Sequence, residues 1–158
     1  METEWRFRSA EGWIELGNYA EAAEELHAFP SDLKSTTAWL RLWVRIYAAT
    51  HMWPNVEAMC ETLLRHAPDD PFAIFHQAEA LHRQGRSREA FSVFQYAPLT
   101  FKQGAPYFYA LARYLCATGQ HSLALSCLGK AFDSDPSLRL EALDDADLQA
   151  VWCDVRDQ

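Results

Sequence analysis

The sequence lacks any long apolar run. Its most apolar stretch, residues 38–49, is interrupted by Arg41 and Arg45, whereas a helix that crosses a membrane needs about 20 predominantly apolar residues. The first eight residues, METEWRFR, also lack the basic segment and the following apolar segment of a signal peptide. We therefore expect a soluble protein that is not inserted into a membrane and stays in the cytoplasm.

Cysteine and glycine are also scarce, with four and six residues respectively. The four cysteines form no CxxC pair, and their helical-looking apolar surroundings predict reduced, packed thiols rather than disulfides or a zinc site. These cysteines are Cys60, Cys116, Cys127 and Cys153. No glycine-rich phosphate-binding loop is present. The sequence therefore gives no sign of a bound nucleotide or metal, and we expect no cofactor.

The signals for catalysis are weak. His76, Glu79 and His82 resemble a metal-binding triplet, but two histidines six residues apart on a helix point about 120° away from each other. Cys127 and His121 have no third group to orient them, as nucleophilic catalysis would require. We therefore expect that the protein is not an enzyme.

Positive charge is in deficit, with 14 Lys and Arg residues against 22 Asp and Glu residues and a net charge of −8. Nucleic acid is not an expected partner, because phosphate binding needs clustered Lys and Arg. The excess acid lies mostly at the C-terminus, where residues 133–158 carry eight acidic and two basic side chains.

What the chain does have is a repeat. Hydrophobic residues make up 49% of the sequence, which is enough for a core in a chain of this length, and small and apolar residues recur at intervals of 34 positions. One register holds Gly17, His51, Gly85 and Gly119. The other registers are Ala22, Val56, Ala90 and Ala124; Leu26, Cys60, Phe94 and Leu128; and Trp13, Tyr47, Leu81 and Leu115. Four copies fit without a gap, at a spacing typical of a helical repeat.

Within each copy the apolar residues are spaced as in amphipathic helices. Residues 108–115 show this spacing before Gly119, and residues 124–131 show it again after the glycine. Each copy is therefore predicted to form a helix, a tight turn and an antiparallel helix. The glycine allows the positive φ that ends the first helix, and the alanines let two helices approach closely.

Three segments carry the clearest motif: GNYAEAAEEL from Gly17, GRSREAFSVFQYA from Gly85 and GQHSLALSCLGKAFDSDP from Gly119. The copy HMWPNVEAMCETLLRHAPDDP departs from it, with His51 in place of Gly and Val56 in place of Ala. These segments resemble the tetratricopeptide repeat (TPR) family. The resemblance implies an all-α fold, a right-handed superhelical solenoid of four antiparallel helix pairs with a C-terminal capping helix. One domain, residues 1–158, would hold repeats at about 3–36, 37–70, 71–104 and 105–138, followed by an acidic cap at 139–158.

The prolines suggest a doubled period. Pro68 and Pro136 close the second and fourth copies at the same phase, whereas Pro30 and Pro98 come four residues earlier in the first and third copies. Because proline cannot continue a helix, the second helices of these two copies should stop early. In the cap, Trp152 is the best candidate to pack on the last repeat, covering the end of the stack as terminal caps do.

By the same resemblance, the first helices of the repeats line a concave groove that binds a peptide. The residues carried over to this groove are Phe7, Arg8, Glu11, Arg41, Leu42, Arg45, Phe72, Phe75, His76, Glu79, Tyr109 and Arg113. Aromatic side chains beside guanidinium groups suit a peptide with apolar and acidic side chains. In the alternative interpretation, Arg41 and Arg45 only keep a helix face solvated and Phe75 belongs to the core.

These features favour a protein-interaction module or adaptor, a monomer or weak homo-oligomer, that binds another protein or peptide. The Lys, Asn and Arg set with which some TPR co-chaperones grip a C-terminal carboxylate is absent. One alternative is a small acidic chaperone like those of type III secretion, and another is a structural oligomerising unit with exposed Trp39 and Trp53. The acidic tail either folds back on Arg41, Arg45 and Arg113 or forms a solvated cap.

Overall fold

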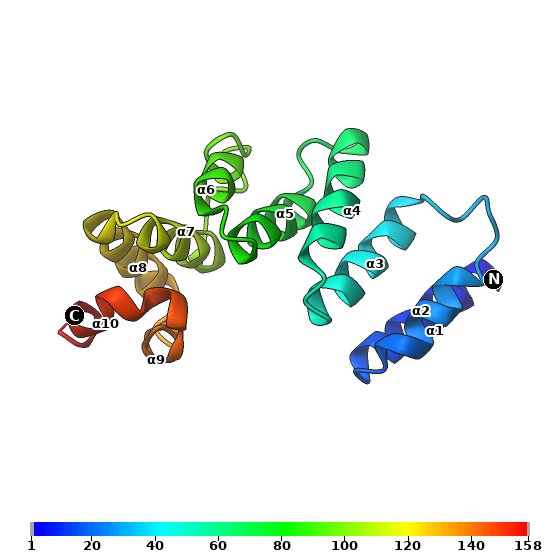
Figure 1. Ribbon diagram of the computed structural model, residues 1–158, viewed down its shortest axis with the longest axis horizontal. Helices are drawn as coiled ribbons and strands as arrows, with labels where there is room; N and C mark the ends of the chain where they lie inside the picture. The colour runs from blue at the N-terminus through cyan, green and yellow to red at the C-terminus, as the bar shows by residue number, and fades with distance from the viewer. Residues whose placement is uncertain (1, 158) are drawn as a thin grey trace. The chain divides into compact units, whose positions relative to one another are not determined.

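The structure is a computed structural model that describes residues 2–157, and every regular element in this range is a helix (Figure 1). The helices are α1 (Glu2–Glu15), α2 (Tyr19–His27), α3 (Thr37–Ala49), α4 (Trp53–His66), α5 (Pro71–Arg83), α6 (Ser87–Gln95), α7 (Ala105–Ala117), α8 (His121–Ser134), α9 (Leu138–Asp144), the 3₁₀ helix η1 (Ala146–Val151) and α10 (Trp152–Arg156). The predicted all-α class is confirmed. Among the described residues no helix has the length and apolar content needed to cross a bilayer.

The period of the sequence repeat is visible in the helix boundaries. Helices α3, α5 and α7 begin at Thr37, Pro71 and Ala105, so each starts one repeat period of 34 residues after the one before. Helices α2, α4, α6 and α8 begin at positions 19, 53, 87 and 121, which are separated by the same interval. The predicted alternation of a first and a second helix in each copy is therefore confirmed.

The turn between the two helices of each copy uses a residue with positive φ. Gly17, Gly85 and Gly119 have φ of 73°, 77° and 79°, and His51 adopts the same conformation with φ of 58°. A side chain makes this left-handed conformation costly, so glycine is favoured there. The backbone of the second copy thus follows the repeat although its residue type does not.

The second helices differ in length as the prolines indicate. Helices α2 and α6 each have nine residues, whereas α4 and α8 each have fourteen. The short helices end before Pro30 and Pro98, as predicted. Long connections follow them, so the pattern of helix lengths repeats every two copies.

The residues fall into two compact units, Met1–Ala80 (unit 1) and Leu81–Gln158 (unit 2). In unit 1, α1 and α2 pack together and against α3, which also packs on α4. Trp43 lies in this core, its ring 5.1 Å from that of Tyr47. The description of Trp39 and Trp53 as exposed is wrong: both are half-buried against the core, and Trp39 Nε1 donates to the Leu26 carbonyl at 3.1 Å.

In unit 2, α7 and α8 pack side by side, and α9, η1 and α10 lie next to them (Figure 1). The cap is therefore three short segments rather than one helix. Leu148, Val151 and Val155 are completely buried in a core shared with α7 and α8. Trp152 packs on this core, and its Nε1 donates to the carbonyls of Ala142 at 2.8 Å and Asp145 at 3.2 Å. The predicted packing role of Trp152 is confirmed.

Candidate functional site

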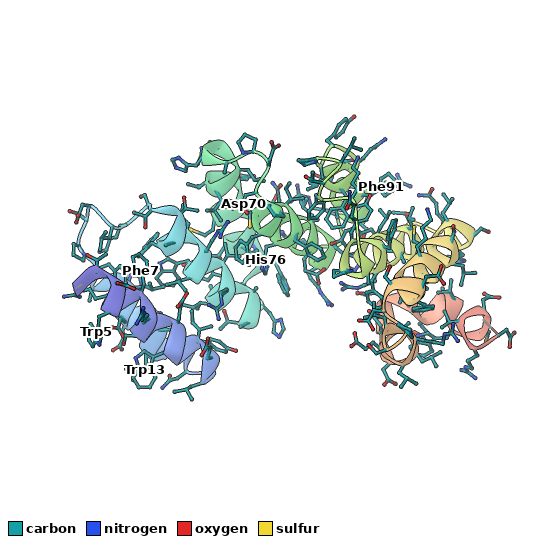
Figure 2. The ribbon with its side chains drawn as sticks, turned by 180° about the vertical axis from the view of Figure 1, so that it is seen from behind. Trp5, Phe7, Trp13, Asp70, His76 and Phe91 are labelled. Atoms are coloured by element: carbon teal, nitrogen blue, oxygen red, sulfur yellow. The ribbon has the colours of Figure 1, made fainter. Side chains whose placement is uncertain are left out.

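The first helix of each of three copies contributes to a cleft in unit 1. The cleft has a volume of about 490 Å³ and is lined by Phe7, Glu11, Thr37, Ala38, Arg41, Leu42, Arg45 and Phe72. Six of the twelve residues carried over to the groove therefore lie together here. Phe7 comes from α1 and Phe72 from the first turn of α5, with α3 supplying most of the rest. Figure 2 shows the side chain of Phe7 projecting from α1.

Arg41 is held in place by Asp70, a residue that the sequence analysis did not select. Arg41 Nη2 donates to Asp70 Oδ2 at 2.7 Å, and the Asp70 side chain is only 4% exposed. Asp70 Oδ1 also accepts from the backbone N–H of Phe72 at 3.0 Å, at the start of α5. The guanidinium carbon of Arg41 lies 5.2 Å from the centre of the Phe72 ring. The charge of Arg41 is thus already balanced, and its side chain fixes one wall of the cleft.

Arg45 differs from Arg41 because no acidic side chain pairs with it in the described part of the chain. It is half-buried, lines the cleft, and has no hydrogen-bond or ion-pair partner among residues 2–157. Glu11, across the cleft on α1, is exposed and likewise has no partner in the described part of the chain. The cleft therefore combines apolar walls with one uncompensated guanidinium group and one carboxylate. Such a surface suits a segment that carries an apolar and an acidic side chain.

The other selected residues of unit 1 lie outside the cleft lining. Arg8 forms an exposed ion pair with Glu4 at 2.8 Å. The rings of His76 and Phe72 are 4.4 Å apart, and burial lowers the pKa of His76 while nearby Glu79 acts in the opposite direction. Phe75 and Glu79 are half-buried and have contacts of their own.

Tyr109 and Arg113 belong to unit 2, where the C-terminal cap covers them. The hydroxyl of Tyr109 donates to Asp145 Oδ2 at 3.0 Å, and burial, followed by the nearby Asp145, raises the pKa of this phenol well above its usual range. Arg113 donates to Asp147 Oδ2 from Nη2 at 2.6 Å and from Nε at 3.0 Å, and it is only 9% exposed. Both side chains therefore hold the cap instead of lining an open groove. The predicted contact between the acidic tail and an arginine occurs at Arg113, whereas Arg41 is occupied by Asp70.

A buried chain of polar contacts extends from Arg113 and Asp147. His82 Nε2 lies 3.0 Å from Asp147 Oδ2, and His82 Nδ1 lies 2.8 Å from the Ser87 hydroxyl. The hydrogen bond from His82, together with those from Arg113, holds the pKa of Asp147 well below its usual range. Asp147 is therefore a carboxylate that accepts a hydrogen bond from Nε2–H of His82, and in this tautomer Nδ1 accepts a hydrogen bond from the Ser87 hydroxyl.

The contacts from Ser87 through His82 to Asp147 have the order of a Ser-His-Asp catalytic triad. Their environment nevertheless favours a structural role. Asp147 is shared with Arg113, and both Ser87 and His82 are buried, at 9% and 8% exposure. The contacts join the ends of α5 and α6 to α7 and η1, so they fix the cap to the rest of unit 2. One signal in the sequence could have revealed the network, because Asp147 follows Arg113 by one period of the repeat.

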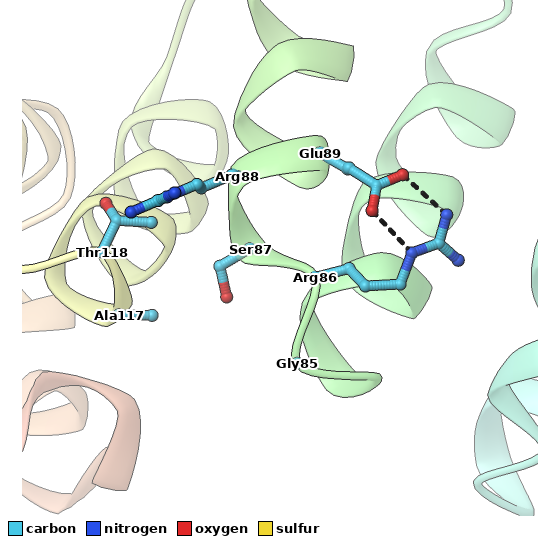
Figure 3. Close-up of a pocket in the computed structure, with 7 residues that line it drawn as sticks. All are labelled: Gly85, Arg86, Ser87, Arg88, Glu89, Ala117 and Thr118. Atoms are coloured by element: carbon cyan, nitrogen blue, oxygen red, sulfur yellow. Dashed lines mark hydrogen bonds and ion pairs between the residues drawn. The ribbon is translucent and has the colours of Figure 1, made fainter.

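A second cleft in unit 2, of about 420 Å³, lies at the start of α6 (Figure 3). Arg86 is occupied there by two ion-pairing contacts with Glu89, at 2.8 and 2.7 Å, which lower the pKa of Glu89. Figure 3 shows the side chain of Arg88 extending toward Thr118. The cleft is lined by residues 85–89 and by Ala117 and Thr118, and all of these except Ser87 are at least partly exposed. It is therefore a polar hollow in the surface and lacks the apolar walls of the cleft in unit 1.

Comparison with models of known protein families gave no match, and comparison with curated proteins gave no significant match. Within the described residues, no cluster of three or more His, Cys, Asp or Glu side chains could hold a metal ion. The cleft in unit 1 is therefore the feature of the structure that bears on function.

Proposed function

We propose that this chain is a TPR-like adaptor without enzymatic activity, which binds a peptide segment of another protein in the cleft of unit 1. The supporting observation is that the cleft gathers Phe7, Glu11, Arg41, Leu42, Arg45 and Phe72, six of the residues that the resemblance to the TPR family assigns to a groove. The half-buried rings of Phe7 and Phe72 supply apolar contact area, which dominates the energetics of peptide recognition. In this proposal the helix pairs form a solenoid and the first helices face the peptide.

The cleft is also partly pre-formed. Asp70 fixes Arg41, which in turn stacks on Phe72, so less side-chain entropy is lost when a ligand binds than with a flexible surface. In this proposal the regularly spaced helices position the cleft, and the side chains that differ between copies make the contacts with the peptide.

The proposal is tested by blocking the cleft without disturbing the core. Ala38 is exposed, lies on α3 and lines the cleft, so Ala38→Trp should fill the cleft and leave the fold intact. A library of random twelve-residue peptides displayed on phage is selected against the full chain, and the affinities of enriched peptides are measured by fluorescence anisotropy.

We expect Ala38→Trp to weaken these peptides about tenfold or more, since it removes much of the contact area. Ala58→Trp is the matched control, because Ala58 is an exposed residue on α4 outside the cleft. The proposal fails if no peptide is enriched, or if the enriched peptides bind Ala38→Trp as tightly as the unchanged chain.

A further inference from the structure

Arg45 and Arg113 occupy equivalent positions in the doubled repeat, but only one of them has an acidic partner among the described residues. Arg45 on α3 and Arg113 on α7 are two copies apart, and both are the ninth residue of a thirteen-residue helix. Arg113 is bound by the carboxylate of Asp147 at 2.6 Å. Arg45 lines the cleft of unit 1 and has no partner among residues 2–157. The side chain that the cap satisfies in unit 2 is thus left unsatisfied in unit 1.

The neighbouring positions on the same helices do not differ in this way. Arg41 and Tyr109 are also two copies apart, and each donates to an aspartate in the segment that follows its helix pair. The partner of Arg41 is Asp70 and that of Tyr109 is Asp145. Arg45 is therefore the one uncompensated guanidinium group among the residues that line the cleft of unit 1.

In unit 2 the carboxylate that binds Arg113 is followed directly by a large aliphatic residue. Leu148, the residue directly after Asp147, is completely buried. The cleft of unit 1 offers apolar surface from the half-buried rings of Phe7 and Phe72 beside Arg45. An acidic residue followed by a large aliphatic residue could satisfy both features of the cleft at once.

We propose that the cleft of unit 1 binds a partner segment through a single carboxylate at Arg45, with an aliphatic side chain directly after that acid packed on the aromatic walls. This inference rests on the proposed function, and it specifies the ligand. Arginine pairs with carboxylates through directed, charge-assisted hydrogen bonds, which are stronger than neutral ones. A second acid in the ligand gains nothing, because Arg41 is already neutralised by Asp70 and the Glu11 carboxylate repels a further negative charge.

The occupant is a segment of another protein and not the cap of a second copy. Asp147 of each chain is held by Arg113 and His82, and Leu148 is buried in its own unit 2. The sequence around these two residues nevertheless gives a defined probe, because the structure shows this segment bound to an arginine at the equivalent register.

The test uses a synthetic peptide with the sequence of residues 143–152, LDDADLQAVW, acetylated and amidated at its ends. In the single-carboxylate peptide, the residues corresponding to Asp144 and Asp145 are changed to Asn. In the neutral peptide, the residue corresponding to Asp147 is changed to Asn as well. Both peptides are titrated by isothermal calorimetry into the full chain, its Arg45→Gln variant and its Arg65→Gln variant. Arg65 is the control because it is an exposed arginine on α4 outside the cleft.

We expect the unchanged chain and Arg65→Gln to bind the single-carboxylate peptide about 10- to 100-fold more tightly than the neutral peptide, the range of one hydrogen-bonded charge pair. In Arg45→Gln this ratio should fall to about one. A ratio that persists in Arg45→Gln overturns the inference and points to displacement of the cap at Arg113. If library peptides bind the cleft but this probe does not, the ligand assignment is wrong while the proposed function stands. If neither library peptides nor the probe bind, both fail.

Discussion

Removing the charge of Asp147 is the sharpest test of how the cap is held. The Asp147→Asn variant keeps the size of the side chain but removes the carboxylate that accepts hydrogen bonds from Arg113 and His82. Arg113 is only 9% exposed, so its guanidinium group remains largely buried after the change. Breaking a buried ion pair by removing one partner leaves a charge that neither water nor protein compensates.

The magnitude follows from the exposure and from the remaining partner. Loss of one member of a buried pair costs about 3–5 kcal/mol. The Asp147 side chain is 25% exposed, and Asp145 Oδ2 stays 3.4 Å from Arg113 Nε, so the effect should lie at the lower end. We expect the free energy of opening of unit 2 to fall by about 3 kcal/mol, which corresponds to about 100-fold faster exchange of its protected amides.

The measurement is hydrogen–deuterium exchange at pH 7, followed by mass spectrometry of peptides that cover α7, α8 and the cap. Asp144→Asn is the matched control, because Asp144 is an exposed acid close in sequence that lacks a partner among residues 2–157. It removes the same charge and should change stability by less than about 0.5 kcal/mol. Equal effects of the two substitutions would refute the reasoning, since general charge reduction would then explain both.

The same contact predicts a pH dependence. The folded-state pKa of Asp147 lies well below its usual range because His82 and Arg113 donate to the carboxylate, while the unfolded chain has a pKa of about 4. A depressed pKa stabilises the folded state above the unfolded pKa, and this stability is lost as the pH falls through the folded pKa. The stability difference between the unchanged chain and Asp147→Asn should therefore shrink below about pH 4. A difference that grows on acidification would contradict this assignment.

Three further substitutions or modifications test other parts of the structure. Cys153 is exposed, whereas Cys60 is completely buried and burial raises its pKa to about 12. Iodoacetamide at pH 8 should therefore label Cys153 first. Equally fast labelling of Cys60, measured by mass spectrometry, would contradict its burial in the core. His51→Gly should raise stability by about 0.5–1 kcal/mol, because glycine accepts the φ of 58° without a steric cost; a lower melting temperature by circular dichroism would count against the turn. Arg41→Ala removes the ion-pair partner of the buried Asp70 carboxylate and should cost about 2 kcal/mol in urea unfolding. Arg45→Ala has no partner to lose and should change stability by less than about 0.5 kcal/mol.

The repeat could be predicted because it depends on local properties of the backbone. Glycine at positive φ and a completely buried alanine recur in three of the four copies, and the helix boundaries follow the same interval. His51 shows the strength of the register, since the turn forms there without glycine. The early ends of α2 and α6 could also be predicted, because proline removes a backbone donor wherever it occurs.

The cleft could be predicted only in part, because its polar contacts join residues far apart in the sequence. Asp70 lies 29 residues after Arg41, and no local pattern marks it as the acid that neutralises this arginine. The acidic tail is expected from the sequence either to fold back on Arg41, Arg45 and Arg113 or to form a solvated cap, and the sequence did not single out Asp147, which is held by three donors. The burial of Trp39 was missed because its indole N–H finds a carbonyl in the preceding helix pair.

In the proposed function, one register of the repeat serves both stability and recognition, and two of its members, Glu11 and Arg45, line the cleft. Glu11, Arg45, Glu79 and Arg113 occupy one position in the four copies, so acid and arginine alternate along the chain. The copies share their turns and small residues, and this position carries the charges that differ. Because the acidic cap follows only the last copy, Arg113 pairs with Asp147 of the cap, whereas Arg45 has no such partner among residues 2–157. In the proposed function, the arginine that binds a ligand is therefore determined by the segment that comes next in the chain and not by the repeat itself. A chain whose Arg113 is changed to Gln should lose cap stability while its cleft in unit 1 still discriminates the single-carboxylate peptide from the neutral one.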